Sequence, residues 1–153
     1  MVGNSGEVGE VGAGMELAAA LEFIRPRKNG VLVALKRDGR PQLSNITYTL
    51  GTDDVVRISI TADRAKYFNL VRDQRASLHV SRDDFWSYVV VEADAELSAI
   101  AADPYDAAVD ELVELYRSVA GEHSDWDKYR AAMVKDRRLV VRLRPVHAYG
   151  MVA

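Results

Sequence analysis

A short stretch in the first half of the chain combines residue types that bind phosphate. A polar strand end, from Ser59 to Thr61, leads into Arg64 and Lys66 at the start of a helix. A guanidinium can grip phosphate oxygens in a fork, and an ammonium adds a point charge. The first helical N–H groups favour an anion at the same place. The spacing predicts an anion site, and the alternative is a pair of solvated cations that oppose the helix dipole.

A second group of polar side chains follows a predicted hairpin turn at Asp38-Gly39. The chain here delivers Gln42, Ser44 and Asn45 into the returning strand. Amide and hydroxyl groups of this kind can hydrogen-bond the edge of a heteroaromatic ring. The alternative is an exposed hairpin face that bonds only water.

Two aromatic residues form a third candidate group near the middle of the chain. Trp86 and Tyr88 are expected on the same side of a long strand that runs from Trp86 to Ser98. Such a pair can wall a planar cofactor, fill an interface or pack in the core. The sequence alone leaves these three roles open.

The composition excludes several other chemistries. The chain has no cysteine, so it has no disulfide, thiolate metal site or cysteine nucleophile, and a cytoplasmic location fits this composition. The histidines lie far apart without metal-ligand spacing, so no metal site is expected. The formal charge of -3 provides no overall positive field for nucleic acid. No apolar run approaches the roughly 20 residues that cross a bilayer. We therefore expect neither a nucleic acid nor a membrane as a partner.

The length of 153 residues accommodates about one domain. Residues 1–14 are rich in glycine and predict a flexible tail, without the basic and apolar regions of a secretory signal. Residues 15–153 are expected to form a single domain.

Helices and strands must position the candidate side chains. Helical spacing and capping patterns, with Asp103 and Ser124 as N-caps, predict helices at 17–24, 65–72, 104–120 and 125–135. Alternation and turn residues predict strands at 31–36, 42–50, 55–61, 76–80, 86–98, 139–143 and 146–151. Short strands joined by tight turns, with helices inserted among them, indicate an α+β protein built on an antiparallel barrel. A Rossmann fold is disfavoured because its glycine-rich strand-to-helix turn is missing.

Several segments together resemble the deazaflavin-dependent reductases of the pyridoxamine-phosphate-oxidase-like group. They are Gly39 to Asn45, Arg64-Ala65-Lys66 with Asn69-Leu70, Arg75-Ala76-Ser77, Trp86-Ser87-Tyr88, and Gly121 to Asp127. Their order and spacing extend the resemblance from about Leu17 to Met151. The resemblance implies a split β-barrel of the FMN-binding type with flanking helices. It also implies a homodimer with two sites for coenzyme F420 at the subunit interface.

The resemblance assigns roles to individual residues. Arg64 and Lys66 would hold the phosphate of the cofactor. The ring pocket and the cofactor side chain would be lined by polar groups of two strands and a helix, namely Gln42, Ser44, Asn45, Ser59, Ile60, Thr61 and Asn69. Trp86, Tyr88 and Arg138 would reach across from the partner subunit, with Arg138 near the acidic tail of the cofactor.

The implied chemistry belongs to the cofactor. A reduced deazaflavin donates a hydride from its own ring, so the protein supplies orientation and shielding, and no catalytic side chain is required. Tyr48, Tyr88 and water are candidates for a proton donor. The expected substrate is a conjugated, electron-poor organic molecule.

Three alternatives stay open at this point. The same fold can hold FMN, as in a flavin reductase or a pyridoxamine-phosphate oxidase. The chain can instead be a non-catalytic carrier of a deazaflavin or flavin. A structural or interaction domain that binds neither cofactor is the third alternative.

Overall fold

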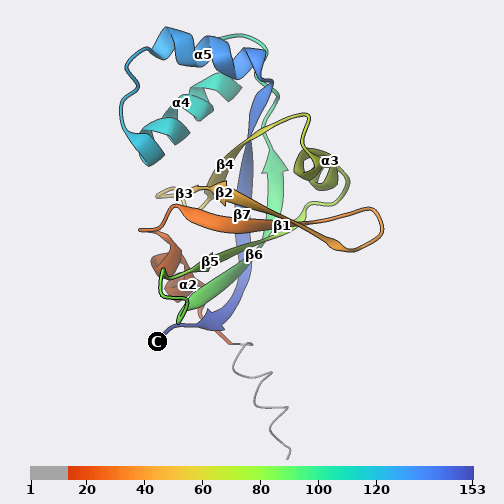
Figure 1. Ribbon diagram of the computed structural model, residues 1–153, viewed down its shortest axis with the longest axis vertical. Coiled ribbons are helices and arrows are strands. Elements are labelled where there is room, and N and C mark those ends of the chain that lie inside the picture. Colours follow the sequence, from red (N-terminus) through yellow and green to blue (C-terminus); the bar gives the residue numbers. More distant parts are fainter. Residues whose placement is uncertain (1–13) are drawn as a thin grey trace, which may run out of the picture.

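The computed structural model describes residues 14–153, so the predicted tail at 1–14 lies outside the described residues apart from Gly14. The described part forms one seven-stranded antiparallel sheet and the helices α2 to α5 (Figure 1). The strands are β1 (Asn29–Leu35), β2 (Pro41–Thr47), β3 (Thr49–Leu50), β4 (Val56–Thr61), β5 (Arg75–Ser81), β6 (Tyr88–Leu97) and β7 (Arg138–Met151). The helices are α2 (Leu17–Ile24), α3 (Ala65–Arg72), α4 (Ala107–Ala120) and α5 (Trp126–Lys135).

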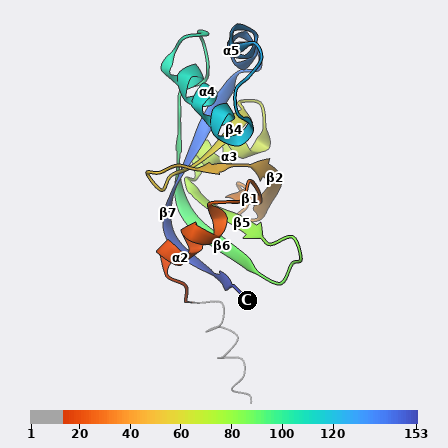
Figure 2. The ribbon, with the colours of Figure 1, turned by 90° about the vertical axis from the view of Figure 1, so that its left-hand side faces the viewer.

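The sheet curls into a half barrel (Figure 2). Its strand order is β2-β1-β5-β6-β7-β4-β3, yet β2 also contacts β4, so the two ends of the sheet approach each other. The short strand β3 pairs with only the first two residues of β4, which leaves the edge from Ile58 to Thr61 without a strand partner on that side. The prediction of an α+β split barrel is confirmed. The split lies between β2 and β4.

Alternation along the strands directs one face of the sheet into the main core. In β4, Val56, Ile58 and Ile60 are buried, whereas the residues between them are partly exposed. Helix α2 packs on β6 and β7 and adds its buried side chains to the same core.

Tyr48 lies at the break between β2 and β3, inside the main core. It is fully buried, and its hydroxyl donates to the backbone carbonyl of Ile24 at 2.6 Å. Burial raises the pKa of this phenol. The interpretation of Tyr48 as a proton donor for a substrate is therefore wrong, because the hydroxyl has no path to a ligand.

Helices α4 and α5 form a hairpin between β6 and β7, at one end of the molecule (Figures 1 and 2). Val109, Leu112 and Met133 of this hairpin pack on Val140 of β7 and make a second, smaller core. Glu111 of α4 accepts charge-assisted hydrogen bonds from two arginines on the sheet, Arg142 at 2.8 Å and Arg57 at 3.0 Å. These bonds fix the hairpin on β4 and β7.

The predicted helix starts are displaced by a few residues. The N-cap of α4 is Asp106, whose side chain accepts from the backbone N–H of Val109 at 2.9 Å. Asp103 instead closes the preceding turn by accepting from the N–H of Tyr105. Similarly, α5 is capped by Asp125 and not by Ser124. Each true cap has a free backbone N–H within reach, which the spacing of acidic residues alone does not reveal.

Three strand predictions also need correction. The predicted strand at 42–50 is interrupted at Tyr48 and forms β2 and β3. Strand β6 begins at Tyr88, so Trp86 lies in the preceding turn and does not share a strand face with it. The turn is set by Phe85, with a φ of 70°, and by a bond from the N–H of Trp86 to Asp84. The two predicted C-terminal strands are one strand, β7, because a register shift between Glu92 and Ala93 accommodates Val146 as an extra residue while Pro145 stays paired with Ala93.

Candidate functional site

A cavity of about 450 Å³ lies where the split in the sheet meets the helical hairpin. The sheet side of the cavity carries Asn45 and Thr47 of β2, Ser59 of β4 and Arg138 of β7, and α3 adds Lys66. The hairpin side is formed by Leu115, Tyr116, Val119, Tyr129 and Met133. The cavity is therefore polar and cationic on one side and mostly apolar on the other, as in sites that bind small organic molecules.

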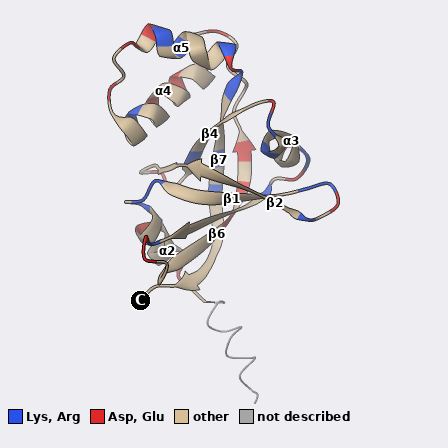
Figure 3. Ribbon diagram, viewed as in Figure 1, with Lys and Arg blue, Asp and Glu red and all other residues tan. Residues whose placement is uncertain are grey.

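Three cations gather at the polar side. Lys66 and Arg138 line the cavity, and Arg64 lies just before α3, beside them. The expectation that Arg138 reaches across from a partner subunit needs correction, because the pairing of β4 with β7 places it at the cavity of its own chain. The pKa of Lys66 is lowered, first by burial and then by the positive charges of Arg64 and Arg138. Figure 3 shows basic residues where α3 and β7 begin. Positive charge is thus concentrated here although the whole chain is slightly acidic.

In the described part of the chain, no carboxylate is within ion-pair distance of these three cations, although the charge of Arg64 helps to lower the pKa of the neighbouring Asp63. Many other arginines do form ion pairs. Asp136 also lines the cavity but is not paired with them. A cluster of cations without a partner has an energetic cost, which a bound anion would relieve.

Hydroxyl groups at the end of β4 support the cations. Arg138 donates to the Oγ atom of Ser59 at 3.2 Å, and Arg64 donates to the Oγ1 atom of Thr61 at 3.3 Å. Thr61 in turn donates to Asp63 at 2.6 Å, which is the first cause of the lowered pKa of that carboxyl. These two hydroxyls orient both guanidinium groups. Thr61 of β4 pairs with Arg138 of β7 in the sheet, so the pairing of these strands places the hydroxyls beside the guanidinium groups.

Other predicted site residues lie nearby without entering the cavity. Asn69 is buried, donates to Gln42 at 3.2 Å and accepts from Arg72 at 2.9 Å, so it ties α3 to β2. The Oγ atom of Ser44 is buried and has no hydrogen-bond partner among residues 14–153. The side chain of Ile60 is in the main core, so only its backbone could face a ligand. Of the residues predicted to line the ring pocket from β2, the structure brings Asn45 to the cavity.

Trp86 and Tyr88 lie at the opposite end of the sheet. Tyr88 pairs with Met151, the last residue of β7, whereas Arg138 is its first residue. A strand of this length spans up to roughly 40 Å, so the two aromatic residues cannot reach the cavity of their own chain. Trp86 is 74% exposed. Both observations are compatible with a role at the site of a second copy.

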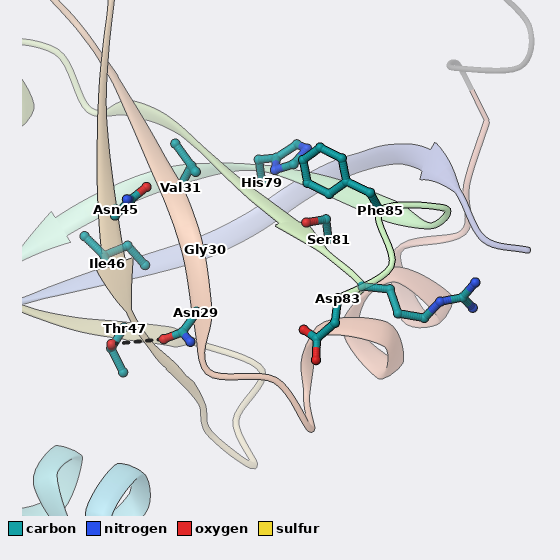
Figure 4. A pocket seen from close by; sticks show the side chains of 11 residues that line it. Asn29, Gly30, Val31, Asn45, Ile46, Thr47, His79, Ser81, Asp83 and Phe85 are labelled. Carbon is teal, nitrogen blue, oxygen red and sulfur yellow. Dashed lines mark hydrogen bonds between the residues drawn. The ribbon is translucent and has the colours of Figure 1, made fainter.

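A second cavity, of about 630 Å³, lies on the outer face of β1, β2 and β5 (Figure 4). Among the predicted site residues it contains only Asn45, together with His79 and the exposed Phe85. Tyr88 stacks on His79 with ring centroids 5.5 Å apart. This cavity contains no cation cluster, since Arg82 is paired with Asp84. The first cavity is therefore the better candidate for an anion site.

The hairpin wall was missed by the sequence-based interpretation. Tyr116 follows the apolar stripe of α4, and Tyr129 and Met133 lie in a helix that carries no chemical motif. The available signal was a pair of tyrosines flanking the loop at Gly121 to Asp127, a segment that also belongs to the family resemblance.

The curled sheet and its split define a split-barrel protein. The sequence profile described as Pyridoxamine 5'-phosphate oxidase matches residues 17–151, so the chain belongs to this family.

Solved structures show the same fold. A conserved hypothetical protein, Rv2991, from Mycobacterium tuberculosis has 21% identity and a TM-score of 0.68, with 90% of this chain and 85% of that chain covered. A protein named F420 reductase has 23% identity and a TM-score of 0.61, with 89% of this chain and 98% of that chain covered. An FMN-binding protein related to pyridoxamine 5'-phosphate oxidase, from Nostoc punctiforme, has 14% identity and a TM-score of 0.60, with 86% of this chain and 79% of that chain covered.

Proposed function

We propose that this chain is a coenzyme F420-dependent reductase that transfers a hydride to an electron-poor, conjugated organic substrate. The observation that carries the proposal is the cluster of Arg64, Lys66 and Arg138, without a carboxylate partner in the described part of the chain, at the polar side of a cavity of small-molecule size. The similarity to a protein named F420 reductase supports it.

The residues at the cavity fit this cofactor. Lys66 and Arg64 would hold its phosphate, and Arg138 would pair with the acidic tail, because three cations provide more positive charge than one phosphate requires. Asn45, Thr47 and the free edge of β4 would bond the polar edge of the ring. When bound, the reduced deazaflavin supplies the hydride. The chain contributes orientation, charge and the exclusion of water.

FMN is the alternative cofactor. It also offers a phosphate and a planar ring, and one structurally similar protein is described as FMN-binding. The excess of cations favours the more anionic deazaflavin cofactor. A non-catalytic carrier would use the same binding groups but would not turn over.

A homodimer is part of the proposal. The sheet and the turn before β6 expose several large apolar side chains, which a second copy would cover: Leu43, Phe85, Trp86, Val146 and Met151. In such a dimer, Trp86 would reach the partner's site. Light scattering should then report about twice the chain mass of 17.0 kDa. A strict monomer that still binds cofactor would contradict the shared site.

A cytoplasmic location, which suits a cysteine-free chain, belongs to the same proposal.

Turnover tests the proposed function. Reduced F420 and reduced FMN are each mixed with the protein and a panel of electron-poor enones and quinones, and oxidation of the cofactor is followed by absorbance. The proposal expects oxidation of reduced F420 that depends on both protein and acceptor. Tight cofactor binding without turnover on any acceptor would indicate the carrier instead.

A further inference from the structure

The hairpin side of the first cavity takes no part in the proposed binding of the cofactor phosphate. Its wall consists of Leu115, Tyr116 and Val119 of α4, and Tyr129 and Met133 of α5. These side chains carry no charge and offer mostly carbon surface, with two phenol hydroxyls. Such a wall suits an uncharged ring and not a phosphate.

The wall is held in place by aromatic packing behind it. The ring centroids of Tyr116 and Tyr129 are 5.0 Å apart with planes at 60°, and Tyr116 meets Trp126 edge to face at 5.7 Å. The hydroxyl of Tyr129 donates to the backbone carbonyl of Leu112 at 3.1 Å. The rings are therefore oriented before a ligand arrives, which reduces the entropy lost on binding.

The two tyrosines differ in what their hydroxyls can do. That of Tyr129 is engaged with Leu112. That of Tyr116 forms no hydrogen bond with any residue in the part of the chain that the structure describes, although its ring lines the cavity. Tyr116 is therefore the polar group on this wall that is available to a ligand.

We propose that this wall binds the hydride acceptor, an uncharged planar molecule with an aromatic ring, and that Tyr116 donates a hydrogen bond to its carbonyl group. The inference rests on the proposed function. The cofactor ring is a poorer occupant, because its polar edge would lose hydrogen bonds against carbon. Asn45, Thr47 and Ser59 on the opposite side of the cavity can bond that edge. The acceptor then lies between the cofactor ring and the hairpin.

Direct binding tests this inference on the protein loaded with oxidised F420. The probes are 4-phenylbut-3-en-2-one and the smaller but-3-en-2-one, and their affinities are measured by saturation-transfer NMR. The phenyl probe should bind at least about tenfold more tightly, because its ring buries apolar surface on the wall. Tyr116→Phe should weaken the phenyl probe about fivefold, and Val119→Phe, which fills the cavity, about tenfold or more.

The controls separate this inference from the proposed function. Tyr105→Phe alters a tyrosine that is 66% exposed and outside the cavity, so probe affinity should not change. Cofactor affinity and melting temperature are measured for every variant, and the conservative Tyr116→Phe guards against misfolding. Equal affinity of the protein for both probes would overturn the inference. Loss of F420 binding in Val119→Phe would also overturn it, because the cofactor ring would then occupy the wall. A wild-type protein that binds no F420 would contradict the proposed function itself.

Discussion

Replacing Lys66 by methionine should move cofactor affinity and protein stability in opposite directions. Lys66 lines the cavity and has a pKa lowered by burial and by two neighbouring cations. A group whose protonated form is disfavoured in the folded state costs folding free energy wherever it is charged. Methionine has a similar length and no charge, so it removes that cost together with the bond to phosphate.

The two magnitudes follow from the contacts. A charge-assisted hydrogen bond contributes about 1.5 to 3 kcal/mol, which corresponds to a tenfold to hundredfold loss of affinity for F420. Relief of like-charge repulsion at a partly exposed site is worth about 0.5 kcal/mol, or a rise in melting temperature of about 1 to 2 °C for a chain of this size.

Fluorescence titration and thermal melting measure both effects on the same samples. The matched control is Lys36→Met in the turn after β1, an exposed lysine that does not line the cavity, which should leave F420 affinity unchanged. Unchanged F420 affinity in Lys66→Met would refute the assignment of Lys66 to the phosphate. A lower melting temperature would refute the electrostatic reasoning.

Three further changes test the fold and the assembly. Glu111→Gln should destabilise the protein by about 2 kcal/mol, lowering the melting temperature by about 4 to 8 °C, because it removes the carboxylate that Arg57 and Arg142 share and leaves them with the more exposed Asp53 and Glu96. The bond to Arg142 is the first cause of the lowered pKa of Glu111, so this stabilisation is present above the ordinary value of 4.5 and is lost as the pH falls through the lowered pKa. The melting temperatures of the wild-type protein and Glu111→Gln should thus differ by a constant amount near neutral pH and converge in acid. A difference in melting temperature that persists in acid would contradict this pH dependence. Asp106→Ala should cost about 1 kcal/mol by removing the N-cap of α4, and an unchanged melting curve would count against that role. Trp86→Ala should weaken dimerisation in sedimentation experiments, while a dimer of unchanged affinity would show that this exposed side chain lies outside the interface.

Elements with a strong local signal could be predicted from the sequence. The range of α3, the alternation in β4 and the turn at Asp38-Gly39 all follow from spacing and turn residues, and the structure has them. Local chemistry could not choose between Asp103 and Asp106, since both can cap a helix and only the path of the chain decides. The position of Trp86 likewise depends on the positive φ of Phe85, which is rare for a large side chain.

The candidate site was predictable only in part for a related reason. Arg64 and Lys66 follow β4 in a recognisable sequence motif and could be predicted. Their proximity to Arg138 depends on the pairing of β4 with β7, which the sequence does not show. Tyr48 looked like an available hydroxyl because burial cannot be deduced from an alternating strand that breaks at that residue. Tyr116 looked like a core residue because a helix stripe does not distinguish a packed face from a cavity wall.

The affinity of the wild-type protein for F420 compared with FMN tests the central claim most directly. Both cofactors are titrated into the same protein under the same salt concentration, since a cation cluster makes binding sensitive to ionic strength. We predict tighter binding of F420, with the preference reduced in Arg138→Ala because the acidic tail loses its partner. Tighter binding of FMN, or purification of the protein with FMN already bound, would contradict the claim.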